Sequence, residues 1–129
     1  MPRFSAPIRG MHFHPPAKAL LGCLPAGCAL RMEREPLNEY DSNAIKVMAL
    51  SETIPEVAHP NLDAMAAGYG FDLKTILAQP EWHLGYIAKE NAQDLAPMLD
   101  AGATASITLA FSPEGKPVGM IQVEEQSSD

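Results

Sequence analysis

Tyr40 and Asp41 are adjacent side chains whose chemistry suits ligand recognition as well as a structural role. A tyrosine ring can stack on another flat ring, and a carboxylate accepts hydrogen bonds from hydroxyl and amide groups. In the structural alternative, Asp41 accepts hydrogen bonds from the amides of Asn43 or Ala44, while Tyr40 covers one end of the fold. Chemistry alone favours this alternative, so the choice depends on where the chain holds the two side chains.

The surrounding sequence predicts a strand, a connection and a second strand. Residues 30–35 alternate between two faces, which is typical of a half-buried strand. Residues 36–42 are rich in the turn formers Pro, Asn, Asp and Ser, and residues 44–48 resume an extended pattern. Tyr40 and Asp41 therefore fall at the end of a connection, where side chains point to solvent or to a ligand.

Residues 33–47, with the sequence EREPLNEYDSNAIKV, resemble the signature of the HIRAN domain family. Residues 83–90, HLGYIAKE, fit the same family, as do a glycine-led first strand at 10–14 and the later residues Ala92, Leu95, Ala96, Pro97 and Gly102. Members of this family occur alone in bacterial and phage proteins, and fused to helicases of the helicase-like transcription factor type. The matching segments follow the expected order along most of the chain.

The resemblance implies an OB-like β-barrel with a pocket for the 3′ end of single-stranded DNA. In the family the Tyr-Asp pair, here Tyr40 and Asp41, helps to form that pocket. Stacking on an aromatic ring is worth ~1–3 kcal/mol per base and does not read the sequence. A carboxylate repels phosphate, so its partner would be the free 3′ hydroxyl, which an internal nucleotide lacks. The DNA-binding residues that we expect on this basis are His12, Phe13, Tyr40, Asp41, Tyr86 and Lys89.

The residues outside the Tyr-Asp pair follow the family to different degrees. Phe13 keeps a stacking surface, but His12 stands where the family commonly has a basic residue, and histidine is mostly neutral at pH 7. Lys89 matches a basic position and would contact phosphate; alternatively, it is a solvated lysine at the start of a helix. Tyr86 stands where the family often has a polar ring. We therefore expect a weaker phosphate contact at His12 than in the family.

The charge of the chain argues against a broad electrostatic attraction for nucleic acid. Sixteen acidic and nine basic residues give a net charge of −7, whereas nucleic-acid-binding domains are usually basic. Residues 1–50 carry six basic and four acidic side chains, but residues 51–82 carry one basic and five acidic side chains. Bound DNA would therefore be held by a few local contacts.

The remaining sequence predicts a small, mainly β domain that also contains helices. The expected elements are strands at 8–13, 82–88, 103–111 and 118–123, a loop with one helical turn at 17–29, and helices at 61–67, 71–78 and 91–101. With the two strands around Tyr40, six short strands suggest a closed or nearly closed barrel. Residues 1–123 would form a single domain with a helical insertion at 51–80, and 124–129 would be a frayed acidic tail.

Some polar residues have expected structural roles. Asn61 and Asn91 would cap the helices that follow them. The helix from Asn91 would bury Leu95, Met98 and Leu99. Arg34 would pair with a buried carboxylate or with carbonyls of the neighbouring turn, in preference to DNA.

The insertion raises an alternative function, binding of a partner protein. Residues 51–82 are acidic and also contain Met65, Tyr69 and Phe71. If this segment packed over Tyr40, it would exclude DNA and the surface would serve as a protein-interaction or scaffold module. Burial of Tyr40 beneath Phe71 or Trp82 would favour this alternative.

Metal binding and catalysis have little support in the sequence. His12, His14, Cys23 and Cys28 are potential zinc ligands, but the cysteine spacing is at the edge of the usual range and a His-x-His pair on a strand points its rings to opposite faces. No phosphate-binding glycine loop or nucleophile motif occurs, so we expect neither enzymatic activity nor a cofactor. The chain also has no apolar run long enough for a membrane span and no secretory signal, which predicts a cytoplasmic protein.

Overall fold

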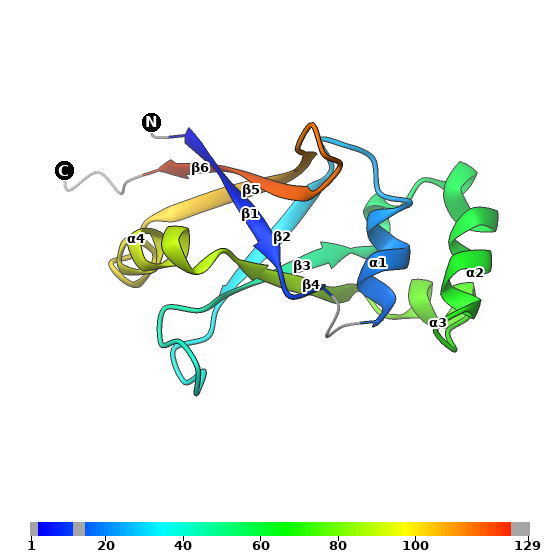
Figure 1. The fold of residues 1–129 in the computed structure, drawn as a ribbon, viewed down its shortest axis with the longest axis horizontal. Helices are drawn as coiled ribbons and strands as arrows, with labels where there is room; N and C mark the ends of the chain where they lie inside the picture. The colour runs from blue at the N-terminus through cyan, green and yellow to red at the C-terminus, as the bar shows by residue number, and fades with distance from the viewer. Residues whose placement is uncertain (1–2, 12–14, 125–129) are drawn as a thin grey trace.

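A closed barrel of six antiparallel strands forms the body of the computed structural model, which describes residues 3–11 and 15–124 (Figure 1). The strands close in the order β1–β4–β3–β2–β5–β6. This confirms the predicted small barrel. In chain order the elements are β1 (Arg3–Arg9), α1 (Pro15–Leu21), β2 (Ala29–Arg34), β3 (Ile45–Leu50), η2 (Ser51–Thr53), η3 (Glu56–Ala58), α2 (His59–Ala67), α3 (Leu73–Ala78), β4 (Glu81–Ile87), α4 (Lys89–Asp100), β5 (Thr104–Phe111) and β6 (Pro117–Glu124).

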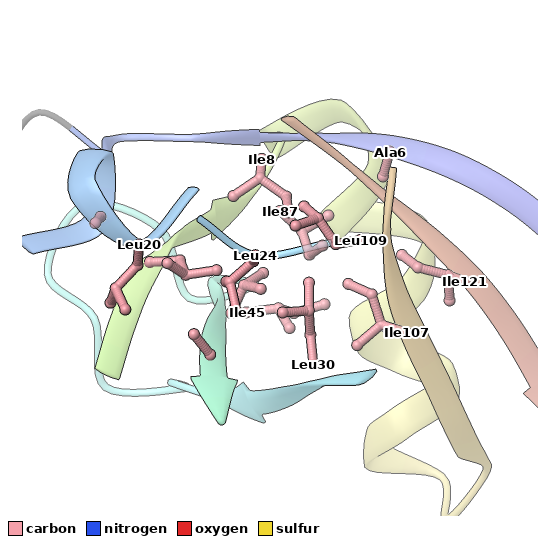
Figure 2. Packing of buried hydrophobic residues seen from close by; sticks show 14 of the residues in the cluster. Ala6, Ile8, Leu20, Leu24, Leu30, Ile45, Ile87, Ile107, Leu109 and Ile121 are labelled. Carbon is pink, nitrogen blue, oxygen red and sulfur yellow. The ribbon is translucent and has the colours of Figure 1, made fainter. Parts of the chain in front are cut away.

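The core of the barrel consists of aliphatic side chains that alternate along each strand. Ile45 and Val47 of β3 are fully buried, and Ile107 of β5 and Ile121 of β6 are nearly so. Figure 2 shows labelled side chains from β1 to β6 pointing toward one another, with Leu20 of α1 beside them. Each such side chain contributes about 1.5–3 kcal/mol by leaving water. The period-2 pattern in the sequence therefore marks the inner face correctly.

Strands β1 and β4 approach each other unusually closely. They pair at Ile8 with Ile87 and at Arg9 with Tyr86. A Cβ atom added to Gly85 would lie 2.4 Å from the carbonyl oxygen of Arg9, so only glycine permits this approach. Across the next pair of strands Tyr86 lies opposite Lys46. Barrel closure thus aligns Arg9, Tyr86 and Lys46 on three neighbouring strands.

The helices lie at two separate places around the barrel. In Figure 1, α4 lies on the left, while α1, α2 and α3 group together on the right. The loop between β2 and β3 projects from the lower edge of the same view, away from α2 and α3. The two helices predicted within residues 51–80 are confirmed as α2 and α3, and α2 packs against α1. Within the described residues, every helix is too short or too polar to cross a membrane.

The first part of the chain differs from the prediction. The first strand covers Arg3–Arg9, so it begins before the predicted start at Ile8, and Gly10, with a φ of 84°, turns the chain at its end. Residues 12–14, predicted as part of this strand, lie outside the described residues. The expected loop at 17–29 begins with helix α1, because Pro15 and Pro16 suit the first turn of a helix and Ala17, Ala19 and Leu20 are buried. Gly22, Pro25 and Gly27, which disfavour regular structure, all follow the end of this helix.

Helix ends and the chain end also differ in detail. Helix α4 begins at Lys89 after Ala88, so Asn91 does not cap it, and Met98 is 38% exposed although we expected burial. Helix α2 begins at His59 with Ala58 as its N-cap, so Asn61 lies inside the first turn. In both helices the N-cap residue is an alanine, whose side chain has no hydrogen-bond acceptor. Glu124, expected in the frayed tail, ends β6 instead, and residues 125–129 lie outside the described residues.

Candidate functional site

The loop between β2 and β3 is held in shape by the side chain of Asn38. Its Oδ1 atom accepts hydrogen bonds from the backbone amides of Tyr40 (2.9 Å) and Asp41 (3.1 Å). Asp41 Oδ1 in turn accepts a hydrogen bond from the amide of Asn43 (2.9 Å), which confirms the capping role considered from the sequence. These short local bonds are typical of Asx turns, and they fix the backbone direction at Tyr40 and Asp41.

Glu35 connects this loop to the barrel. Its Oε1 atom accepts hydrogen bonds from Asn38 Nδ2 (2.6 Å) and from the hydroxyl of Tyr86 (2.8 Å), and its Oε2 atom lies 3.6 Å from Lys46 Nζ. Burial raises the pKa of Glu35, but the bonds from Asn38 and Tyr86 and the charge of Lys46 outweigh it, so the pKa is lowered. Burial and the Glu35 carboxylate raise the pKa of Tyr86 to about 12. At neutral pH Tyr86 is therefore a neutral donor to an ionised acceptor.

Arg34 anchors the other side of the loop. Its guanidinium group donates to the carbonyl oxygens of Ala44 (2.8 Å) and Ser42 (3.0 Å). It also binds both carboxylate oxygens of Asp100 at the end of α4, at 2.9 and 3.1 Å. The predicted structural role of Arg34 is confirmed, although the Asp100 side chain is 56% exposed and not buried. Two anchors, Glu35 and Arg34, thus hold the loop in place.

An open pocket with a volume of about 810 Å³ lies between this loop and the ends of strands β1 and β4. We call it the β2–β3 pocket. It is lined by Arg9, Gly10, Asn38, Tyr40, Asp41, Ala44, Tyr86, Ile87, Ala88 and Lys89. Four of the six residues expected at a DNA site, namely Tyr40, Asp41, Tyr86 and Lys89, are therefore brought together. His12 and Phe13 lie outside the described residues.

Tyr40 is 86% exposed at this pocket. The structural alternative, in which its ring covers one end of the fold, is therefore wrong. The insertion does not cover it either, because a side chain this exposed cannot lie beneath Phe71 or Trp82. Those two rings pack edge to face with each other, with centroids 5.8 Å apart. The pocket is open to solvent.

Two basic side chains that could contact phosphate, Lys89 and Arg9, lie on the rim of the pocket. Lys89, the first residue of α4, is exposed, and it forms no ion pair within the described part of the chain. Arg9 Nη2 lies 3.0 Å from Glu90 Oε1, and both side chains are about 60% exposed (61% and 59%). Asp41 supplies negative charge on the opposite rim. The pocket therefore combines a stacking surface, a hydrogen-bond acceptor and two cations.

Arg9, Asn38 and Glu35 belong to this site, but they were not predicted from the sequence. Arg9 was placed inside the first strand, and only the pairing of β1 with β4 brings it to Tyr86. Asn38 gives a detectable local signal, since an Asn two residues before Tyr40 suits an Asx turn. Glu35 gives none, because its partner Tyr86 lies far along the chain.

The potential metal ligands do not form a site in the described residues. No group of three or more His, Cys, Asp or Glu side chains there is arranged to hold a metal ion. Burial raises the pKa of the thiols of both Cys23 and Cys28, which favours the protonated form. His12 and His14 lie outside the described residues. The two cysteines therefore behave as packing residues.

Replacement of Tyr86 with phenylalanine should destabilise the fold by about 1 kcal/mol, because a hydrogen bond to a charged acceptor is lost at a partly exposed position. Urea denaturation of Tyr86→Phe measures this. Tyr69→Phe is the matched control, since Tyr69 is 43% exposed and its hydroxyl makes no hydrogen bond with a described residue. Equal stability of the two variants would show that the bond from Tyr86 to Glu35 contributes nothing.

Comparison with known proteins finds one matching family and two similar solved structures. The sequence model of the HIRAN domain family matches residues 2–124. A solved structure of a protein from Lactobacillus plantarum is similar at 22% identity, with 94% of this chain and 92% of that chain covered and a TM-score of 0.61. The crystal structure of the HIRAN domain of human HLTF is similar at 18% identity, with 96% and 77% covered and a TM-score of 0.56. No curated protein matches the sequence.

Proposed function

The chain belongs to the HIRAN domain family, and from this premise we propose that its β2–β3 pocket binds the 3′ end of single-stranded DNA. HIRAN domains are nucleic-acid-binding modules and are not catalytic. The observation that carries the proposal is the exposed ring of Tyr40 beside Asp41, at the mouth of an open pocket with basic residues on its rim.

The ring of Tyr40 would bind the terminal base. A base that stacks on an aromatic side chain gains ~1–3 kcal/mol, whatever its identity. The pocket volume of about 810 Å³ lies within the range of small-molecule sites and suits a terminal nucleotide. Because the loop is already fixed by Asn38 and Glu35, little ordering of the backbone would be needed on binding.

Asp41 would select a free strand end. Its Oδ1 atom is used by the amide of Asn43, which leaves the second carboxylate oxygen to accept a hydrogen bond from the 3′ hydroxyl. An esterified or phosphorylated 3′ oxygen cannot donate that bond, and a phosphate group beside the carboxylate would be repelled. The same carboxylate that opposes general binding of DNA would thus favour a terminus.

Lys89 and Arg9 would hold the adjacent phosphate groups. With a net charge of −7, the chain has no broad positive field to add to these contacts. We therefore expect modest affinity that falls with increasing salt, in line with a small number of phosphate contacts. The chain would bind the end without transforming it.

A fluorescence titration with two labelled oligonucleotides tests this function. An oligonucleotide with a free 3′ hydroxyl should bind at least about 10-fold more tightly than the same strand with a 3′ phosphate, since a charge-assisted hydrogen bond is worth ~1.5–3 kcal/mol. The control carries the phosphate at the 5′ end and should bind like the unmodified strand. A closed circle of the same sequence, which has no end, should bind as weakly as the blocked strand. Equal affinity for the free and blocked 3′ ends would rule out the end pocket.

A second candidate function, binding of a partner protein, is favoured by a groove on the insertion. The groove has a volume of about 720 Å³ and is lined by apolar residues, including Ile54 and Leu77, and by Glu52 and Glu56. Nearby, Val57 is 88% exposed. The acidic and apolar lining of this groove would suit a basic, apolar segment of another protein. Such binding would be insensitive to substitutions in the β2–β3 pocket, which separates it from the proposed function.

A further inference from the structure

Arg9 occupies a position at the pocket that barrel closure fixes. It is the last residue of β1 and pairs with Tyr86 of β4, and its carbonyl oxygen lies against Gly85. Gly10, at a φ of 84°, then turns the chain away from the strand. The Arg9 guanidinium group is left on the rim, with its side chain 61% exposed. Its backbone is therefore rigid while its charged end is accessible.

The charge of Arg9 is not free, because Glu90 neutralises it. Arg9 Nη2 lies 3.0 Å from Glu90 Oε1, and the Glu90 side chain is 59% exposed. Such an exposed ion pair is worth only about 0–1 kcal/mol, so a phosphate group can displace the carboxylate. Glu90 also lies in the first turn of α4, where the helix dipole favours a negative charge with or without Arg9. Glu90 therefore competes with phosphate and would remain ionised after losing Arg9.

The other basic side chains near the loop are already engaged in structural contacts. Lys46 lies 3.6 Å from Glu35 and 3.7 Å from Glu33, and its side chain is 24% exposed. Arg34 is 16% exposed and binds Asp100 together with two loop carbonyls. Moving either would disturb the loop that carries Tyr40. Among the described residues that line the pocket, Arg9 and Lys89 are thus the cations that a strand can recruit at low cost.

We infer that Arg9 is a phosphate-binding residue of the β2–β3 pocket and that Glu90 lowers DNA affinity by competing for it. This inference rests on the proposed function. It assigns the two residues opposite effects on one equilibrium: Arg9 strengthens binding and Glu90 weakens it. The chain would then hold a DNA end more weakly than its pocket allows, because part of its positive charge is masked when no strand is bound.

Removal of the Glu90 charge should strengthen binding. Glu90→Gln keeps the size of the side chain and its helix propensity, and it should bind an oligonucleotide with a free 3′ hydroxyl about 2- to 5-fold more tightly than the wild type, the range expected for one competing surface ion pair. Because Arg9 then contacts phosphate fully, the plot of log Kd against log salt should steepen by about 0.7, the value for one added contact to a single strand.

Two further variants separate this effect from a general change in charge. Glu114→Gln alters the net charge equally, but Glu114 is an exposed residue of the β5–β6 turn and does not line the pocket, so affinity and salt slope should stay at wild-type values. In an Arg9→Gln background the Glu90→Gln substitution should have almost no effect, because no partner is left to release. Circular dichroism of all variants checks that each is folded.

The outcomes distinguish this inference from the proposed function. If Glu90→Gln binds DNA no more tightly than the wild type, the inference is overturned and the proposed function stands. The same holds if Glu90→Gln and Glu114→Gln gain equal affinity. An equal gain with and without Arg9 would show that Glu90 acts on the phosphates directly and would also overturn it. If neither the wild type nor Glu90→Gln binds any oligonucleotide, the proposed function fails and the inference fails with it.

Discussion

Replacement of Tyr40 with alanine is expected to weaken binding of a free 3′ end about 10- to 100-fold, because one stacked base is worth ~1–3 kcal/mol. The folded state should be nearly unaffected. Tyr40 is 86% exposed, and the hydrogen bonds that fix it use its backbone amide, which alanine keeps. The titration with the free-ended oligonucleotide measures the first effect, and thermal unfolding measures the second.

Two matched variants sharpen this test. Tyr40→Phe keeps the flat ring and should bind within a few-fold of the wild type, as stacking does not need the hydroxyl. Leu37→Ala removes another apolar side chain from the same loop, one that is 95% exposed and does not line the pocket, and it should leave affinity unchanged. Wild-type affinity in Tyr40→Ala would show that DNA, if bound, does not stack on this ring. Equal losses in Tyr40→Ala and Leu37→Ala would indicate a general effect on the loop.

Replacement of Gly85 with alanine is expected to be the most destabilising single change at the site. The new Cβ would lie 2.4 Å from the carbonyl oxygen of Arg9, and because this atom belongs to the backbone of β1 it cannot move aside like the end of a side chain. The cost should reach at least about 3 kcal/mol, the upper end for overpacking. For a domain of this size that lowers the unfolding temperature by about 10 °C.

Other glycines provide the controls for Gly85→Ala. Gly68 has a right-handed φ of −63° and only one close neighbour, the carbonyl oxygen of Met65 at 3.4 Å, so Gly68→Ala should be almost neutral. At Gly119 the nearest atom is the Cδ1 of Ile107, the end of a flexible side chain, and Gly119→Ala should fall between the two. Differential scanning calorimetry ranks the three variants. A Gly85→Ala variant as stable as Gly68→Ala would mean that β1 and β4 do not approach so closely.

Loss of the contact between β1 and β4 would also affect the pocket, because Arg9 and Tyr86, which line it, are paired on these two strands. Any Gly85→Ala protein that remains folded should therefore bind DNA more weakly. Tyr40→Ala, in contrast, should reduce binding without reducing stability. The two variants thus separate the part of the site that binds from the part of the barrel that positions it.

The strand pattern could be predicted from the sequence because alternation of buried and exposed residues is a local property. Ile107 and Leu109 mark the inner face of β5 unambiguously, and the turn formers before Asp41 locate the β2–β3 loop. The first strand was placed wrongly because its inner face is made partly by a small residue, Ala6, which gives a weak signal. Helix α1 is longer than the single helical turn expected at 17–29, because burial of Ala17 and Leu20 outweighs the nearby Gly and Pro.

Turn chemistry and strand alternation act over a few residues, so local sequence was enough to place Tyr40 and Asp41 together on an exposed loop between two strands. Tyr86 and Lys89 were expected beside them from the family resemblance, whereas the position of Arg9 and the packing of the insertion on α1, away from Tyr40, follow from the folded barrel. The physical reason is the range of the interactions. Pairing of β1 with β4 joins residues far apart in the chain, and its register depends on the packing of the whole barrel.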